Sequence, residues 1–169
     1  MASYGRSVQG VPPSLRAGHR RAAAWCAGRT GHRPCTTTTL AYHFGAYSDP
    51  EVSIQTDQIA DWIALHRCLN YTTRVRVRKA WLHHTKVLSR LPSTARWQVV
   101  AGPLGATVAT LLQNQWHPSL PTVWLAPDRV TQAVVGARTC DTGEIIRTFQ
   151  ASVARGVWAR AAGGVRAGE

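Results

Sequence analysis

The sequence predicts a mainly α-helical fold, a small domain of about five helices with one short β-hairpin. Apolar residues recur at the three- and four-residue spacing of amphipathic helices through most of the chain. That period gives way only near 122–135, where short β-like runs occupy Thr122–Leu125 and Arg129–Val135. Pro127 and Asp128 stand between these runs and suit the turn of a hairpin.

Length and composition fit one globular domain. The 169 residues are enough to bury a core, and the hydrophobic fraction of 44% is ordinary for a folded chain. No apolar run approaches the roughly 20 residues that span a bilayer. We find no internal repeat. We expect a single domain over 14–163, with a flexible lead-in over 1–13 and a loose tail over 164–169.

The first part of the domain is expected to hold two helices. Ser14 would cap the first, which runs to about Ala27 and stops at Gly28. The run Thr36–Thr39 either begins a second helix that continues through Phe44 or forms a short strand. The strand stays open as an alternative because threonine is β-branched and stiff.

The clearest helix is expected after a loop over 45–55. Thr56 or Asp57 would cap this helix, and Asn70 would end it. Its apolar positions share one helix face and are Ile59, Trp62, Ile63, His66 and Leu69.

A long cationic helix is expected from about Thr73 to Leu91. The alternation of Arg and Val over 74–78 is typical of a strand. A helical period over the longer window outweighs it, with Val77, Trp81, His84, Leu88 and Leu91 on one face. The densest cationic stretch of the chain lies on this helix: Arg74, Arg76, Arg78, Lys79, Lys86 and Arg90.

Two further helices are expected, one on each side of the hairpin. Gly102-Pro103 opens the first, because proline suits the first turn of a helix, and it runs to about Gln115. Thr142 would cap the second, with Glu144 in its first turn, where the helix dipole favours an acid. Gly163-Gly164 would stop this last helix.

No catalytic, cofactor-binding or metal-binding constellation can be assembled from the sequence. Asp57 and Asp61 share a helix face, but in an expected first turn they simply complement the dipole. The segment 102–105 precedes a helix without the Lys-Ser/Thr ending of a phosphate loop. Neither a C-x-x-C pair nor a zinc spacing occurs among Cys26, Cys35, Cys68 and Cys140. We therefore expect a protein that is not an enzyme.

Histidine and tryptophan residues on or near the cationic helix are further candidate site residues. His83 and His84 are neighbours on a helix and point in different directions, so one should face the core and the other the solvent. Trp81, Trp97 and Trp116 either stack on bases or pack in the interior, which is the commoner role of tryptophan.

The net charge of +12, from 20 Lys and Arg against 8 Asp and Glu, attracts polyanions, of which nucleic acid is the commonest. Because Lys79 and Lys86 are the only lysines, the arginine excess is equally typical of a GC-rich coding sequence. Arg16, Arg20 and Arg21 are expected to face water or a partner.

The start of the chain bears on where the protein works. The first 48 residues hold six Arg and no acid, as an organellar transit peptide does. Pro12 and Pro13 interrupt the amphipathic helix that such a peptide needs. We expect an intracellular protein, cytoplasmic or nuclear, with organellar import as the alternative.

Three stretches of the chain combine diffuse hydrophobic patterns with placed Trp, Pro and Gly. They are Ser14–Asp49 with its Arg-Pro-Cys-Thr-Thr-Thr-Thr-Leu, Arg96–Trp116 continued by Pro118, Pro121 and Trp124, and Phe149–Trp158 with a Gly-rich exit. Together they resemble the region between the reverse transcriptase and RNase H-like domains of protist non-LTR retrotransposon polyproteins. The resemblance covers roughly residues 14 to 168.

The resemblance implies a thumb-like or connector segment that helps to grip a template–primer duplex. Its partners would be nucleic acid (RNA, DNA or a hybrid) and the flanking polyprotein domains, without a cofactor or a membrane. The chain departs from the pattern in lacking the acidic metal-binding motif of the polymerase and any RNase H acid set. It also lacks the usual Trp after the hairpin turn, at 129–132. No catalytic residue can be carried over.

The expected function is therefore non-catalytic and non-specific binding to the nucleic-acid backbone, through phosphate contacts of the six cations named above. Two alternatives remain open. One is a basic structural or protein-interaction domain whose charge is incidental, and the other is an open reading frame without a selected function.

Overall fold

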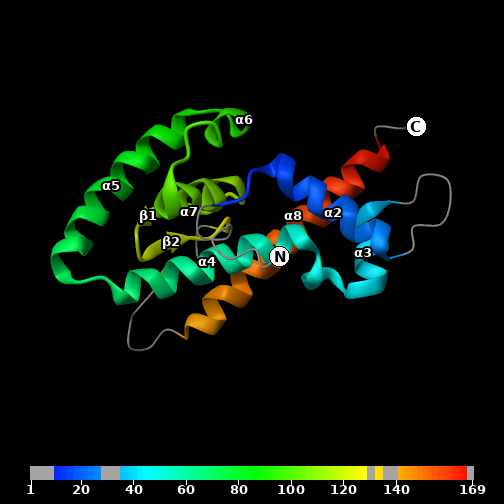
Figure 1. Cartoon of the computed structure of the whole chain (residues 1–169), viewed down its shortest axis with the longest axis horizontal. Helices are drawn as coiled ribbons and strands as arrows, with labels where there is room; N and C mark the ends of the chain where they lie inside the picture. The colour runs from blue at the N-terminus through cyan, green and yellow to red at the C-terminus, as the bar shows by residue number, and fades with distance from the viewer. Residues whose placement is uncertain (1–9, 28–34, 129–131, 135–140, 167–169) are drawn as a thin grey trace.

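The computed structural model describes residues 10–27, 35–128, 132–134 and 141–166, and it is mainly helical, as predicted (Figure 1). The helices in the described part are α2 (Pro13–Cys26), α3 (Thr36–Phe44), the 3-10 helix η1 (Ala46–Ser48), α4 (Pro50–Cys68), α5 (Tyr71–Arg90), α6 (Ser93–Arg96), α7 (Gly102–Gln113) and α8 (Thr142–Arg166). The run of threonines is helical, which decides against the alternative of a strand.

The predicted hairpin is confirmed and carries a third strand. β2 (Val123–Leu125) pairs antiparallel with β3 (Gln132–Val134), and β1 (His117–Leu120) lies on the other side of β2. β1 was not predicted, because its His-Pro-Ser-Leu lacks β-branched residues and proline is confined to sheet edges. Residues 129–131 and 135 of the second predicted strand lie outside the described residues.

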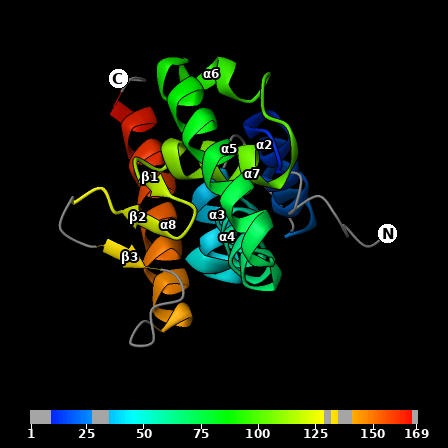
Figure 2. The ribbon, with the colours of Figure 1, turned by 90° about the vertical axis from the view of Figure 1, so that its left-hand side faces the viewer.

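Helix α4 is the centre of the packing. It contacts α8, α2 and α7, while α5 packs against α7 and β1 (Figures 1 and 2). The main core cluster joins α4, α5, α7, α8 and the sheet, and its largest side chains are Trp62, Trp81, Trp116, Trp124 and Phe149. Burial of large aromatic side chains therefore holds the domain together.

The start of α4 differs from the prediction. The helix begins at Pro50, and the Asp49 carboxylate caps it by accepting a hydrogen bond of 2.8 Å from the Glu51 N–H. The expected loop over 45–55 and the expected cap at Thr56 or Asp57 are therefore wrong. Asp-Pro is an N-cap followed by a proline in the first turn, so it opens the helix two turns earlier.

The earlier start also moves Asp57 and Asp61 out of the first turn. They lie in the middle of α4, where the helix dipole gives them no support. Burial raises the pKa of the Asp57 carboxyl, a hydrogen bond from Ser53 opposes this, and the charge of Asp61 adds to the rise.

Other helix ends also differ from the prediction. Pro12, not Ser14, is the cap position of α2. Asn70 does not end α4 but caps α5, where its side-chain oxygen accepts a hydrogen bond from the Thr73 N–H at 2.8 Å. Helix α8 continues through Gly163-Gly164 to Arg166, so the two glycines do not stop it.

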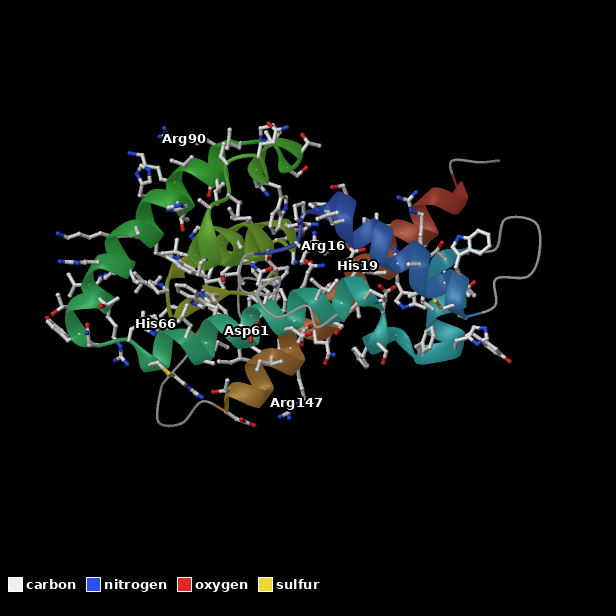
Figure 3. All side chains as sticks on the ribbon, viewed as in Figure 1. Arg16, His19, Asp61, His66, Arg90 and Arg147 are labelled. Carbon is white, nitrogen blue, oxygen red and sulfur yellow. The ribbon has the colours of Figure 1, made fainter. Side chains whose placement is uncertain are left out.

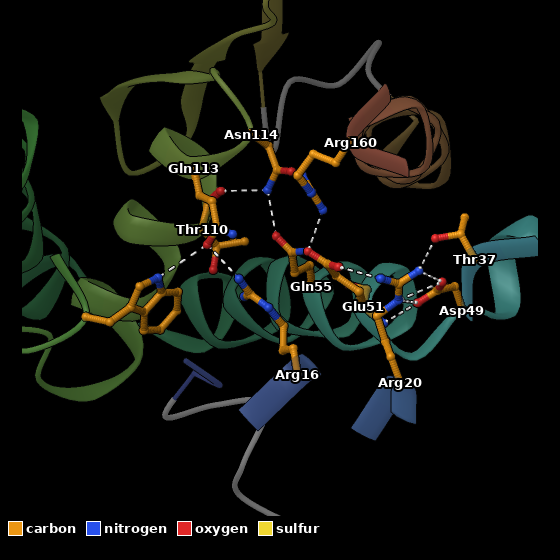
Figure 4. Close-up of polar contacts among 11 residues, drawn as sticks. Arg16, Arg20, Thr37, Asp49, Glu51, Gln55, Thr110, Gln113, Asn114 and Arg160 are labelled. Carbon is orange, nitrogen blue, oxygen red and sulfur yellow. Dashed lines mark hydrogen bonds and ion pairs between the residues drawn. The ribbon is translucent and has the colours of Figure 1, made fainter. Parts of the chain in front are cut away.

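Polar contacts tie α2, α7 and α8 to α4 (Figure 4). Arg20 of α2 binds Asp49 at 2.9 Å and approaches Glu51 at 3.7 Å. Arg160 of α8 reaches the same Glu51 at 2.7 Å. One turn further along the same face, Asn114 donates a hydrogen bond of 2.7 Å to Gln55. Charged and amide side chains thus join α2, α4, α7 and α8.

Candidate nucleic-acid interface

Helix α5 forms one outer edge of the molecule (Figures 1 and 2). Its inner face is held by Trp81 and Leu88, both fully buried in the core. All six predicted site residues are exposed, namely Arg74, Arg76, Arg78, Lys79, Lys86 and Arg90. The face opposite the core is therefore the cationic one, and Figure 3 shows side-chain nitrogens extending outward from this helix.

Four of the six cations lie in one row with a histidine. Arg76, Lys79, His83, Lys86 and Arg90, here called the basic row, follow one another at steps of three and four residues. At 3.6 residues per turn the row spans an arc of about 80° and a length of roughly 21 Å, on the side opposite the buried residues. That length matches about six phosphates of one B-form strand.

Arg74 and Arg78 stand apart from the row: at 100° per residue Arg74 lies almost in line with Trp81, and Arg78 lies about 60° from it. A guanidinium N–H of Arg74 donates to the Arg67 carbonyl at 3.1 Å, so this side chain closes the corner between α4 and α5. His83 was not among the predicted site residues. Its place one heptad after Arg76 and one before Arg90 is the sequence signal that marks it.

The cations of the basic row form no ion pair with an acid among the described residues. Helix α5 contains no Asp or Glu, and the ion pairs between described residues are Arg20–Asp49, Arg20–Glu51, Arg147–Asp141 and Arg160–Glu51. The three acids in these pairs thus bind cations of α2 and α8 rather than those of α5. A row of exposed cations without acidic partners attracts phosphate groups.

Apolar side chains flank the row on the same helix. Val75, Leu82 and Val87 are exposed, Leu82 to 49%. On a wheel of 100° per residue, Val75 and Leu82 lie beside Lys79 and Lys86. The surface therefore offers apolar contact to sugar and base edges next to the cations that would bind phosphates.

The arginines of α2, the first described helix, do not belong to the basic row. Arg16 is only 1% exposed, which corrects the expectation that it faces water. Its Nη2 donates to Oε1 of Gln113 at 2.6 Å, and its guanidinium lies 5.4 Å from the ring centroid of Trp97. Burial lowers the pKa of Arg16 to about 10, against the opposing charge of Glu51. This cation is structural.

The candidate tryptophans and histidines differ in how far the structure exposes them. Trp81 and Trp116 are buried, as expected, so neither offers a face to a base. Trp97 is half-buried and donates its indole N–H to Gln113 at 3.3 Å. His83 is exposed, and His84 is half-buried with Nδ1 3.0 Å from the Ala80 carbonyl.

The described residues also bear on metal binding and on membrane insertion. Among the described residues, no three His, Cys, Asp or Glu side chains gather closely enough to hold a metal ion. The described helices include none that is both long and apolar enough to cross a membrane. Cys26, Cys35 and Cys68 are free thiols, while Cys140 lies outside the described residues.

Comparison with protein-family models, with curated proteins and with solved structures finds no match to this chain. The resemblance to the retrotransposon region therefore stays a prediction from the sequence.

Proposed function

We propose that this domain binds the phosphate backbone of nucleic acid without catalysing a reaction, and that α5 is the contact helix. The observation that supports the proposal is the basic row, which is exposed and has no acidic partner among the described residues. Because phosphate contacts carry no sequence information, the binding would be non-specific.

The resemblance to retrotransposon polyproteins suggests the ligand. A thumb or connector segment between a reverse transcriptase and an RNase H-like domain would meet an RNA–DNA hybrid. A helix with cations along roughly 21 Å of its outer face suits one strand of such a duplex. The proposal is thus a non-catalytic fragment of a retrotransposon polyprotein that helps to hold the template–primer duplex.

Fluorescence anisotropy with an RNA–DNA hybrid in a salt series tests this proposal. The test variant replaces Arg76, Lys79 and Lys86 by Gln. The matched control replaces Arg21, Arg147 and Arg155, exposed cations outside α5, and lowers the net charge equally. Three lost phosphate contacts make the plot of log affinity against log salt less steep by about 2.7, whereas loss of net charge alone acts equally in both variants.

We expect the row variant to lose at least tenfold in affinity at 0.15 M salt, and the control to lose no more than two- to threefold. Equal losses in the two variants would contradict α5 as the contact helix. Binding without any salt dependence, or no binding at low salt, would overturn the proposed function itself.

A protein-interaction domain is the second candidate, and a different observation favours it. Large aromatic side chains are exposed away from α5, with Trp25 at 69% and Tyr42 at 86%. Exposed rings of this size are common at protein interfaces. Under this alternative, the row variant captures the same partner as the natural chain in affinity purification, and the double variant Trp25→Ser, Tyr42→Ser does not.

A further inference from the structure

The corner between α4 and α5 carries an exposed aromatic ring. Tyr71 is the first residue of α5, and it is 83% exposed. The first α5 residue that packs against the main core cluster is Val77, so the turn that carries Tyr71 lies outside the core. The corner is the end of α5 that meets α4 in Figure 1. An exposed tyrosine offers a ligand a flat, largely apolar ring with one polar end.

Three hydrogen bonds hold this corner in place. The side-chain oxygen of Asn70 accepts from the Thr73 N–H at 2.8 Å, which caps α5. The Arg74 guanidinium donates to the Arg67 carbonyl at 3.1 Å. The Arg67 guanidinium donates in turn to the hydroxyl of Thr142, at the start of α8. The backbone beside the exposed ring is therefore fixed before a ligand arrives, which lowers the ordering cost of binding.

Two cations lie beside the ring, and they are the two predicted site residues that the basic row leaves out. Arg74 follows Tyr71 by three residues and Arg78 follows it by seven, so at 100° per residue they lie about 60° and 20° from it around the helix. Both cations are exposed, and neither pairs with an acid among the described residues. Proteins bind single-stranded nucleic acid with this combination, in which bases stack on aromatic rings and cations contact the backbone.

A ridge of α5 connects the ring to the basic row. Side chains four residues apart on a helix are neighbours, and the ridge consists of Tyr71, Val75, Lys79 and His83. Val75 is exposed, and the last two residues belong to the basic row. Tyr71 lies about 12 Å from Lys79 along the helix axis and about 80° from it around the helix. A strand that leaves the row thus reaches the ring within roughly four nucleotides.

We propose that Tyr71 stacks on an unpaired base of a strand whose paired part lies on the basic row, and that Arg78 contacts a phosphate beside that base. The ligand is therefore a duplex with a single-stranded extension, such as a template that continues past its primer. Every base has a flat face, so stacking selects an unpaired base without selecting its identity. Arg74 holds the corner and is a positioning residue. The inference rests on the proposed function, because the basic row holds the duplex from which the extension leaves.

The test compares two RNA–DNA hybrids of 12 base pairs by fluorescence anisotropy at 0.15 M salt. One hybrid is blunt, and in the other the RNA strand continues with four unpaired uridines at each end. We expect the extended hybrid to bind about tenfold more tightly. Tyr71→Ala should lower this ratio to about twofold, the share of the additional phosphates, whereas Tyr71→Phe keeps the ring and the ratio. Tyr47→Ala removes another exposed tyrosine, outside α5, and should leave the ratio unchanged.

Arg78→Gln tests the phosphate contact. One lost contact to a single strand should make the plot of log affinity against log salt less steep by about 0.7 for the extended hybrid. The slope for the blunt hybrid should stay as it is. Arg21→Gln, at an exposed position of α2, removes the same charge and should leave the difference between the two slopes unchanged. An equal change of both slopes in Arg78→Gln would contradict its place beside the unpaired base.

The outcomes separate the two proposals. Equal affinity for the blunt and the extended hybrid, or a ratio that Tyr71→Ala lowers no more than Tyr47→Ala, would overturn the stacking site. Backbone binding stays in place in that case if the row variant still binds more weakly than the natural chain. No binding of either hybrid at low salt would overturn both proposals.

Photo-cross-linking adds a measurement that does not depend on affinity. The unpaired uridines are replaced by 5-iodouridine, which on irradiation joins efficiently to an aromatic ring stacked against it. Mass spectrometry of the digested complex should find the cross-link on Tyr71. The same yield from Tyr71→Ala as from the natural chain, or a set of cross-linked peptides without Tyr71, would refute the stacking site.

Discussion

The indole rings of Trp62 and Trp81 lie 5.1 Å apart between centroids and are tilted by 32°. Each ring also donates its N–H to a carbonyl at 3.0 Å, Trp62 to Pro121 and Trp81 to Pro118. One pair of side chains thus joins α4 to α5 and fastens both helices to the segment that carries β1. Because Trp81 faces inward, the cations on the other side of α5 must face outward.

The Trp81 hydrogen bond should contribute measurably to stability. Trp81→Phe keeps an aromatic ring but leaves the Pro118 carbonyl with only a long contact of 3.4 Å from Thr85. We expect the free energy of unfolding to fall by about 1–3 kcal/mol, in urea denaturation followed by circular dichroism. Trp158→Phe, at a partly exposed position, is the control and should change it by less than about 0.5 kcal/mol.

A cation at the centre of the row should strengthen binding. His83→Arg places a permanent charge between Lys79 and Lys86, and one more phosphate contact steepens the salt dependence by about 0.9. We expect the affinity for the RNA–DNA hybrid to rise about threefold or more at 0.15 M salt. His43→Arg adds the same charge on α3 and should have a smaller effect; equal gains would argue that only net charge matters.

Removing the partner of the buried Arg16 should cost more than removing Arg16 itself. Gln113→Leu leaves the guanidinium buried without its 2.6 Å acceptor, and leaving a buried charged donor unpaired costs about 3 kcal/mol of unfolding free energy. Arg16→Met removes the charge and keeps an apolar chain beside Trp97, so we expect a change within about 1 kcal/mol. Urea denaturation of both variants is the measurement, and the reverse order would show that the cation is net stabilising.

His66 should make the domain less stable in mild acid. Burial lowers the pKa of this imidazole below its ordinary 6.5, and the charge of Arg74 lowers it further. Between the folded and unfolded pKa the unfolded chain binds more protons, so the free energy of unfolding falls as the pH drops through this window just below 6.5. His66→Gln should flatten that dependence between pH 7.5 and 5, and His19→Gln, on the exposed side of α2, should not.

Much of the helical framework could be predicted from local patterns. The heptad-like recurrence of Trp81, His84 and Leu88 was long enough to outweigh the strand-like alternation over 74–78, and α5 follows that prediction closely. The start of α4 could not be recognised by the same means. Gln55, Gln58 and Thr56 are buried polar residues, so an apolar period does not mark the first two turns.

The candidate sites depend on contacts between distant residues. That Arg16 is buried follows from Gln113, 97 residues away, and nothing in the first helix alone indicates it. The basic row, in contrast, lies on a single helix, so the sequence identified four of its five members.

Glu51 of α4 forms an ion pair with Arg20 of α2 at 3.7 Å and accepts a hydrogen bond of 2.7 Å from Arg160 of α8, two residues 140 positions apart in the sequence. Replacing either arginine removes one of the two partners of Glu51 and leaves the other in place. Arg20→Gln and Arg160→Gln should therefore weaken the same place, the first turn of α4, although the two residues lie on helices far apart in the sequence. Glu51 thus connects the first and the last of the described helices.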